Sequence, residues 1–372
     1  MEQLKVVLDN YLSSRAQNSR AFAPSTPEQH AIAEEIPKFF SNAVAVLGFN
    51  LDGYKIEGSY GAGNMSMCPW IAVFDIRITS SAQRGYYIVL LFAEDMRSCY
   101  LSLNQGFTSY TQIYAANRIA RRKAGETARR ALDHIDSPAH AVRGRIDLAA
   151  SGGLGRGYED CAILSFRYSA ANLPPSRQLT DDLRVLLTAY SKLYEKCGIG
   201  LHELAPATES DFQEDANEVA QRMSEIDKEC VETEGPEPVS HAGFPRVGFN
   251  PRYKRNPRKA ASAFRAAGFK CEVEPSHVTF TSRSTSHQYV EAHHLIPMKN
   301  QADSPYNLDV RANIISLCPT CHRLLHHGHA SDKKQILLSL FNKRRDALVS
   351  KGIDVTFPIL AAMYSGDVID DD

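Results

Sequence analysis

Two histidine-bearing stretches in the last third of the chain decide its fold: YVEAHHLIPM, residues 289–298, and NLDVRANIISLCPTCHRLLHHG, residues 307–328. The first predicts a short strand over 289–295 that stops before the following proline, which cannot donate the next ladder hydrogen bond. This strand carries two adjacent histidines, His293 and His294, close to its end. We therefore expect a strand that delivers imidazole groups to a site.

The second stretch predicts another strand, a tight turn and a helix. Asn313 precedes the apolar run IISL, and the next four residues, CPTC, form a C-x-x-C knuckle that leads into the helix. On that helix His322 and His326 are four residues apart, so their side chains face the same side. Strand, loop, strand and helix with inward histidines predict a small unit built around a metal ion.

Taken in order, these residues resemble the HNH, or ββα-metal, nuclease family, and most closely the branch found in McrA-type methyl-directed restriction enzymes. The resemblance covers about residues 250–330, and a helix is expected after it over 332–351. Phosphodiester hydrolysis needs a base that deprotonates water, and we assign this role to His294, because neutral imidazole accepts a proton near pH 7. Asn313 is expected to orient the loop and this base through its side-chain amide.

The same resemblance implies one catalytic divalent cation, held by His293, His322 and His326. Imidazole-rich ligation admits Mg, Mn, Ni or Zn, so the residues leave the identity of the ion open. A cation at this position would stabilise the charge that develops on the phosphate and on the leaving oxygen.

A second, structural zinc is expected in the same domain. Cys318 and Cys321 provide one half-site at the usual C-x-x-C spacing. Many relatives provide the other half as a second C-x-x-C, but here Cys271 is followed at that spacing by Glu274. The next candidate is His277, which would complete a Cys3His tetrahedron, and Glu274 is the weaker alternative because oxygen ligands are less common in closed zinc sites.

The first 200 residues predict one mixed α/β domain. Alternating and apolar runs predict strands over 54–60, 70–78, 86–92 and 98–103, and helical spacing predicts helices near 31–49, 109–134 and 178–196. This pattern places four strands between an early helix and two later helices. It indicates a sheet with helices packed against it.

Part of this domain resembles the N-terminal DNA-binding domain of the McrB family, which reads methylcytosine in modification-dependent restriction. The resemblance covers about residues 1–190, and its specific part, 58–106, holds the turn GAGN, the pair PW and the strand start GYY. It implies a pocket for a flipped, modified cytosine lined by Trp70, Tyr87 and Leu91, with Asn64 in the turn. A flipped base must regain stacking on aromatic faces. An ordinary core role stays open, because residues four apart on a strand share a face in either case.

Charge changes sign sharply after residue 200. Residues 203–237 hold twelve Asp/Glu and two Lys/Arg, which predicts an acidic helix and linker over 201–245. Residues 243–270 hold eight Lys/Arg and no acid, and they open the C-terminal domain, 246–372. We expect this basic segment to contact DNA phosphates through Lys254, Arg255, Arg258 and Lys259.

A second basic stretch lies within the N-terminal domain. It comprises Arg118, Arg121, Arg122, Lys123, Arg129 and Arg130, on a predicted helix. Such a stretch either follows a DNA backbone or forms a solvated helix face, and the sequence alone leaves both interpretations open.

Composition and known motifs exclude several classes of protein. The 372-residue chain holds 42 Lys+Arg against 43 Asp+Glu, so its net charge identifies no partner. Its N-terminus is charged and amphipathic rather than a secretory signal, and its longest apolar run is eight residues, too short for a membrane span. No G-x-x-x-x-G-K-[ST] motif is present, which argues against a nucleotide-driven motor. We expect a cytoplasmic protein that binds neither membrane nor nucleotide.

These features predict an α+β protein with an N-terminal mixed α/β DNA-binding domain, 1–200, and a small zinc-stapled HNH nuclease domain. We expect a modification-dependent, type IV-like restriction endonuclease that recognises modified cytosine, such as 5-methylcytosine, in double-stranded DNA and acts in phage defence. One HNH site cuts one strand, so a double-strand break requires a homodimer or two sequential nicks. The alternative is an HNH DNA endonuclease whose N-terminal domain senses another ligand or partner and does not discriminate cytosine modification.

Overall fold

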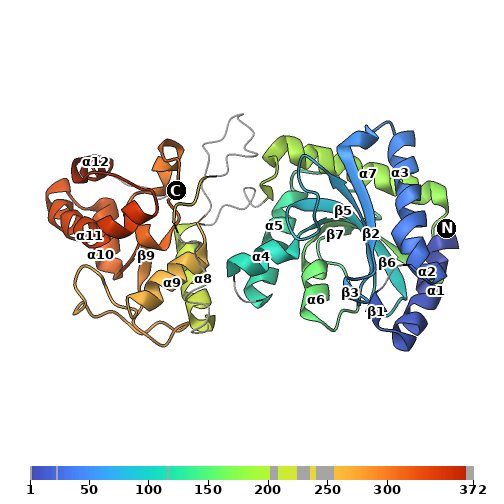
Figure 1. The fold of residues 1–372 in the computed structure, drawn as a ribbon, viewed down its shortest axis with the longest axis horizontal. Coiled ribbons are helices and arrows are strands. Elements are labelled where there is room, and N and C mark those ends of the chain that lie inside the picture. The colour runs from blue at the N-terminus through green and yellow to red at the C-terminus, as the bar shows by residue number, and fades with distance from the viewer. Residues whose placement is uncertain are drawn as a thin grey trace. The chain divides into compact units, whose positions relative to one another are not determined.

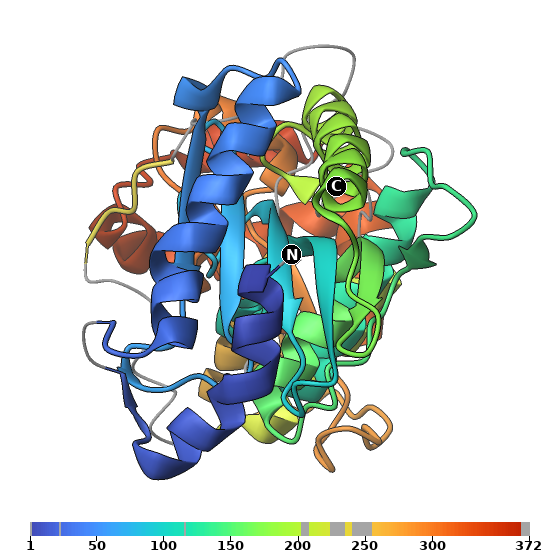
Figure 2. The same ribbon diagram turned by 90° about the vertical axis from the view of Figure 1, so that its right-hand side faces the viewer.

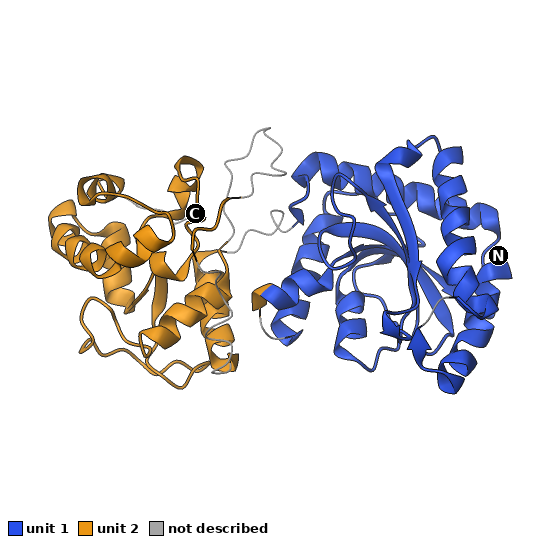
Figure 3. Cartoon of the chain, viewed as in Figure 1, with its two compact units in different colours: residues 1–112, 117–205, 243–247 blue, residues 113–116, 206–242, 248–372 orange. Residues whose placement is uncertain are grey.

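The computed structural model of the chain describes residues 2–21, 24–114, 117–201, 208–223, 235–239 and 255–365. The chain divides into two compact units, the first built mainly from residues before 202 and the second mainly from residues after 207 (Figure 3). Both units mix helices and strands, which confirms the predicted fold class. In the described part of the chain, no helix is both long and apolar enough to cross a bilayer.

The first unit is built on a six-stranded sheet in which every neighbouring pair is antiparallel (Figure 1). In spatial order the strands are β2 (Tyr54–Ser59), β4 (Trp70–Asp75), β5 (Tyr86–Phe92), β6 (Ser98–Gln105), β8 (Ala162–Ser169) and β7 (Val142–Arg143). A small separate pair joins β1 (Arg20–Ala21) to β3 (Gly63–Asn64). The four strands predicted from alternating and apolar runs are all present.

Helices cover both faces of this sheet, so its central strand is buried throughout. Tyr86, Ile88 and Leu90 of β5 belong to the core beneath α1 (Glu2–Gln17), α3 (Ile36–Val46) and α7 (Ser176–Cys197), whereas Tyr87 and Leu91 point to the opposite face. Figure 2 shows α1, α3 and α7 lying across one face of the sheet. The helical segments of this unit are α1 (Glu2–Gln17), α2 (Pro27–His30), η1 (Ala31–Glu35), α3 (Ile36–Val46), η2 (Leu51–Gly53), α4 (Phe107–Tyr114), α5 (Asn117–Leu132), α6 (Gly153–Asp160) and α7 (Ser176–Cys197).

The second unit places helices around one short hairpin. Strand β9 (Glu291–His294) pairs antiparallel with β10 (Ile314–Leu317), and His294 lies opposite Ile314 in this register. The helical segments are α8 (Glu209–Arg222), α9 (Pro257–Ala266), η5 (Met298–Asp303), η6 (Arg311–Asn313), α10 (Pro319–His327), α11 (Ala330–Ser350) and α12 (Phe357–Met363). Asn256 caps α9 by accepting a hydrogen bond from the Arg258 backbone amide at 2.9 Å, just before Pro257.

Helix α8, which lies within the predicted acidic linker region, packs into this second unit. The buried amide of Gln213 bonds to Ala292 of β9 in both directions: Nε2 donates to its carbonyl at 2.7 Å, and Oε1 accepts from its amide at 2.6 Å. Asn217 adds a bond from Nδ2 to the Val290 carbonyl at 3.1 Å. One face of α8 therefore satisfies the free edge of β9, while Asp211 and Glu214 are exposed to solvent.

Candidate active site

Strand β9 and helix α10 bring three histidines together. One ring nitrogen from each of His293, His322 and His326 lies within 4.8 Å of the others, and the two Nε2 atoms on α10 are 3.0 Å apart. All three residues are buried, the most exposed being His326 at 7%. Converging imidazole nitrogens in a dry site are a donor set that suits one divalent cation, so the residues fit the metal implied by the sequence.

Two polar residues, Glu291 at the start of β9 and Tyr364 just after α12, orient these rings. Glu291 Oε2 lies 2.7 Å from Nδ1 of His322, which leaves Nε2 facing the cluster. The Tyr364 hydroxyl lies 2.8 Å from Nε2 of His293 and donates to the Leu295 carbonyl at 2.8 Å. Because that hydroxyl has a single proton, it accepts from the His293 Nε2–H, and this tautomer leaves Nδ1 as the ligand atom.

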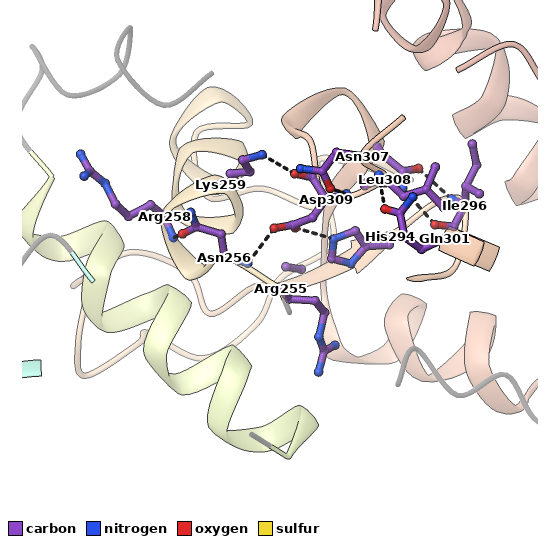
Figure 4. Close-up of polar contacts among 12 residues, drawn as sticks. Arg255, Asn256, Arg258, Lys259, His294, Ile296, Gln301, Asn307, Leu308 and Asp309 are labelled. Carbon is purple, nitrogen blue, oxygen red and sulfur yellow. Dashed lines mark hydrogen bonds and ion pairs between the residues drawn. The ribbon is translucent and has the colours of Figure 1, made fainter. Parts of the chain in front are cut away.

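His294, the neighbour of the cluster, forms a buried pair with Asp309. Its Nε2 lies 3.0 Å from Asp309 Oδ1, and the two residues are 0% and 3% exposed (Figure 4). The other carboxylate oxygen, Oδ2, accepts the Asn256 backbone amide at 2.7 Å. His294 Nδ1 is buried and has no hydrogen-bond partner among the described residues. An ionised Asp309 accepts the Nε2–H, so the lone pair of the imidazole lies on Nδ1.

Asp309 is itself fixed by its surroundings (Figure 4). Lys259 Nζ donates to the Asp309 carbonyl at 2.6 Å and pairs with Glu237 Oε2 at 3.1 Å. Asn307 accepts the Asp309 backbone amide at 2.9 Å and donates to the same Glu237 oxygen at 3.1 Å. The carboxylate that holds His294 is therefore part of a connected polar network, which restricts its position.

Asn313, the central residue of the predicted motif, joins the two ends of the loop between β9 and β10. Its Nδ2 donates to the Ile296 and Leu308 carbonyls, both at 2.9 Å, and its Oδ1 accepts the Ile296 amide at 2.8 Å. Gln301 closes the same loop by accepting the Leu308 amide at 2.7 Å. The asparagine is fully buried, so these bonds hold the loop that carries Asp309.

A second cluster contains the cysteines of the knuckle. Cys271, His277, Cys318 and Cys321 each offer one ligand atom within 4.8 Å of the others. His277 Nδ1 lies 3.6 Å from Cys318 Sγ and 3.4 Å from Cys321 Sγ. Hydrogen bonding from Cys321 lowers the pKa of the Cys271 thiol to about 4, and a thiolate is the form that binds zinc. Glu274 is exposed and lies outside this cluster, where its carboxylate accepts the Ser276 amide at 3.1 Å.

The basic segment before α9 differs from the exposed patch expected from its charge. Lys254 lies outside the described residues, and the Arg258 side chain is half-buried. Arg255, with a side chain 6% exposed, forms an ion pair with Glu209 of α8. Lys259 is 8% exposed and is held in the Asp309 network described above. Burial and acidic partners thus direct Arg255 and Lys259 into the second unit.

In the first unit, three of the four predicted base-contacting residues share one sheet face. Trp70 lies opposite Leu91 across β4 and β5, and the Tyr87 ring packs at a tilt of 58° against Phe74 on the same face, with ring centroids 5.1 Å apart. Tyr87 and Leu91 are only 3% and 2% exposed, whereas Trp70 is half-buried. Asn64 is exposed on β3, in the separate two-stranded sheet. Of the three residues on this sheet face, Trp70 is therefore the most accessible.

The sequence patterns did not reveal Glu291, Asp309 or Tyr364. Glu291 and Asp309 lie inside the quoted stretches, but an acid beside a strand or in a loop resembles an ordinary solvated residue. Tyr364 lies 71 positions after His293, so no local spacing signals its contact. Their roles become visible only when the helices and the loop are packed together.

Comparison with known families agrees with this geometry. A family model described as the MrcB-like N-terminal domain matches residues 6–195, and one described as an HNH endonuclease matches residues 271–331. No curated protein and no solved structure shows a significant match to the chain. The HNH match contains both clusters, and the resemblances predicted from the motifs are confirmed. The chain therefore belongs to the MrcB-like N-terminal domain family and is a metal-dependent DNA endonuclease of the HNH type.

Proposed function

We propose that this protein is a modification-dependent, type IV-like restriction endonuclease, in which the first unit reads modified cytosine and the second unit hydrolyses DNA. The observation that carries the proposal is the buried trihistidine cluster beside the His294–Asp309 pair, in the same chain as an MrcB-like domain. The domain organisation would be 1–200 for reading, 201–245 for the acidic connection and 246–372 for cutting.

His294 would act as the general base. Asp309 holds its Nε2–H at 3.0 Å, so the unpartnered Nδ1 would accept the proton of the attacking water. Asn313 would keep the loop that carries Asp309 in place through its three backbone contacts. These residues would position and deprotonate the nucleophile.

His293, His322 and His326 would hold the catalytic cation, with Glu291 and Tyr364 fixing the ring orientations. When bound, Mg, Mn, Ni or Zn would supply charge stabilisation at the phosphate and the leaving oxygen. Cys271, His277, Cys318 and Cys321 would hold a structural zinc, which suits a unit with a small hydrophobic core.

Recognition of the modified base would use the sheet face of Trp70, Tyr87 and Leu91. A flipped cytosine would stack on the half-buried Trp70, while its added methyl group would contact apolar side chains. Asn64 would contact the DNA near this base. Cutting both strands would require a homodimer or two sequential nicks, since each chain carries one HNH site.

A second candidate is an HNH nuclease whose first unit does not discriminate cytosine modification. The burial of Tyr87 and Leu91 favours it, because a base reaches these side chains only if the sheet face opens. One duplex sequence prepared with cytosine, 5-methylcytosine or 5-hydroxymethylcytosine, cut with Mg²⁺, Mn²⁺ or Ni²⁺, separates the two candidates. Cutting confined to a modified duplex supports base reading, and equal cutting of all three duplexes supports the second candidate.

A further inference from the structure

The first unit contains an arginine-lined cleft that the proposed base-reading face does not use. Helix α5 and the residues around β7 line a cleft of about 580 Å³. Six arginines line it: Arg118, Arg121, Arg122, Arg129, Arg143 and Arg145. The only acids in the lining are Glu126 and Asp160, so the described walls carry an excess of positive charge.

The acidic residues hold some of these arginines in place without enclosing them. Arg145 Nη2 lies 2.9 Å from Glu159 Oε2 and its Nε lies 3.3 Å from Asp160 Oδ1, yet its side chain is 60% exposed. Asp160 also pairs with Arg121, whose side chain is 26% exposed. A guanidinium has five N–H donors, so one that contacts a carboxylate can still donate to a phosphate. The cleft is therefore preorganised for an anion.

The spacing on α5 indicates an extended anion. Arg118, Arg122 and Arg129 are separated by four and seven residues, which places them on one helix stripe. At 1.5 Å per residue this stripe is roughly 16 Å long. A DNA strand carries one phosphate per ~3.4 Å of helix axis, so the stripe spans several phosphates. A single small anion would occupy only part of this stripe.

Two glycines leave the cleft open between the arginines. Gly125 lies on the same stripe, and a Cβ there would meet only the Asp160 carbonyl, at 3.8 Å. Gly144 has φ +76° and has space around it, with no atom within 4 Å of a Cβ. Glycine weakens the interior of a helix, and packing does not require it at 125. An approaching backbone needs this space.

We propose that this cleft binds the sugar–phosphate backbone of DNA and positions the duplex independently of cytosine modification. The basic stretch on α5, ambiguous in the sequence, then follows the DNA together with Arg143 and Arg145. The proposal rests on the DNA-processing function of the chain, but not on base reading. It predicts a phosphate contribution that is equal for modified and unmodified duplexes.

The test is DNA binding by the full-length protein without added divalent metal. One fluorescent duplex is used with cytosine or 5-methylcytosine, over a series of salt concentrations. Arg129→Ala should weaken binding to both duplexes by the same factor, at least about threefold, and reduce the salt slope by about one unit. Gly125→Leu should fill the cleft and weaken binding further while keeping or raising the melting temperature, because leucine favours the helix. The matched control is Arg177→Ala on α7, where the side chain is 95% exposed and lies outside the cleft.

Wild-type affinity and an unchanged salt slope in both Arg129→Ala and Gly125→Leu would overturn the proposal. Binding of polyglutamate is measured with the same two variants. If they lose affinity for polyglutamate but keep wild-type affinity for DNA, the proposal is also overturned, because that result assigns the cleft to an acidic polypeptide. Base reading is measured separately, by the affinity ratio of the two duplexes in the wild-type protein. A ratio of one would contradict modified-cytosine recognition, yet a uniform loss in Arg129→Ala would still support the cleft.

Discussion

His294 and Asp309 form a buried contact, with Nε2 of the histidine 3.0 Å from Oδ1 of the aspartate and side-chain exposures of 0% and 5%. The pair lies beside the trihistidine cluster, because His294 follows His293 on β9. It links the proposed base to a loop that Asn313 and Lys259 hold from two sides.

Asp309→Asn should slow DNA cleavage strongly. The amide can accept the Nε2–H only through its oxygen, and an amide turned the other way favours the tautomer with a proton on Nδ1. We expect a single-turnover rate lower by about 100-fold or more, within the range typical of general-base loss, with DNA affinity unchanged. The control is Asp346→Asn, an exposed acid on α11. A wild-type cleavage rate in Asp309→Asn would remove this residue from the mechanism.

Glu291→Gln should weaken binding of the proposed catalytic cation without unfolding the chain. Glu291 orients His322 through a 2.7 Å contact, and loss of such a contact typically costs about 10–100-fold in metal affinity. The measurement is calorimetric titration with Mn²⁺ or Ni²⁺, with Glu214→Gln on the exposed face of α8 as the control. Equal affinities in the two variants would contradict the orienting role.

The fourth ligand of the proposed structural zinc can be identified by metal content. We expect the purified wild-type protein to contain zinc, and His277→Ala and Cys318→Ser should each lower its zinc content and its melting temperature, because both side chains belong to the cluster. Glu274→Gln should retain that zinc, since the carboxylate is exposed and lies outside the cluster. Elemental analysis of the purified variants gives the answer, and loss of zinc in Glu274→Gln alone would reverse the assignment.

Gln213→Ala should destabilise the second unit. It would leave the Ala292 amide and carbonyl without their bonds at 2.6 and 2.7 Å, and each unsatisfied buried group costs about 1–3 kcal/mol. Chemical denaturation should show a loss of roughly 2–4 kcal/mol in the free energy of unfolding. Gln221→Ala, an exposed glutamine on the same helix, should leave it unchanged.

Trp70→Ala tests the base-reading face. It should remove the preference for a modified duplex while leaving cutting of unmodified DNA as it was, because stacking of the flipped base depends on the accessible ring. The control, Ile76→Ala, removes an apolar side chain that is 54% exposed in the same unit. A modification preference that survives Trp70→Ala would place the reading site elsewhere.

Local patterns predicted much of this protein, because a helix repeats every 3.6 residues and a strand every two. The four strands of residues 54–103 and the pairing of His322 with His326 follow from such spacing. The adjacent histidines, Asn313, the C-x-x-C knuckle and the histidines of the next helix together indicated the nuclease family, since this chemistry lies in short segments. These features need no knowledge of how distant segments meet.

Packing between distant segments accounts for the rest. Gln213 reaches Ala292 across 79 positions, and Tyr364 reaches His293 across 71, so no spacing in the chain signals either contact. The charge of Lys259 predicted an exposed, DNA-facing side chain, yet burial directs it to the Asp309 network. Conversely, the sequence left open whether the arginines of α5 form a solvated helix face. In the structure they line a cleft together with Arg143 and Arg145, which are distant from most of them in the chain. Residue types and periods are local properties of the chain, whereas burial and the partners of a charge depend on which surfaces meet when it folds.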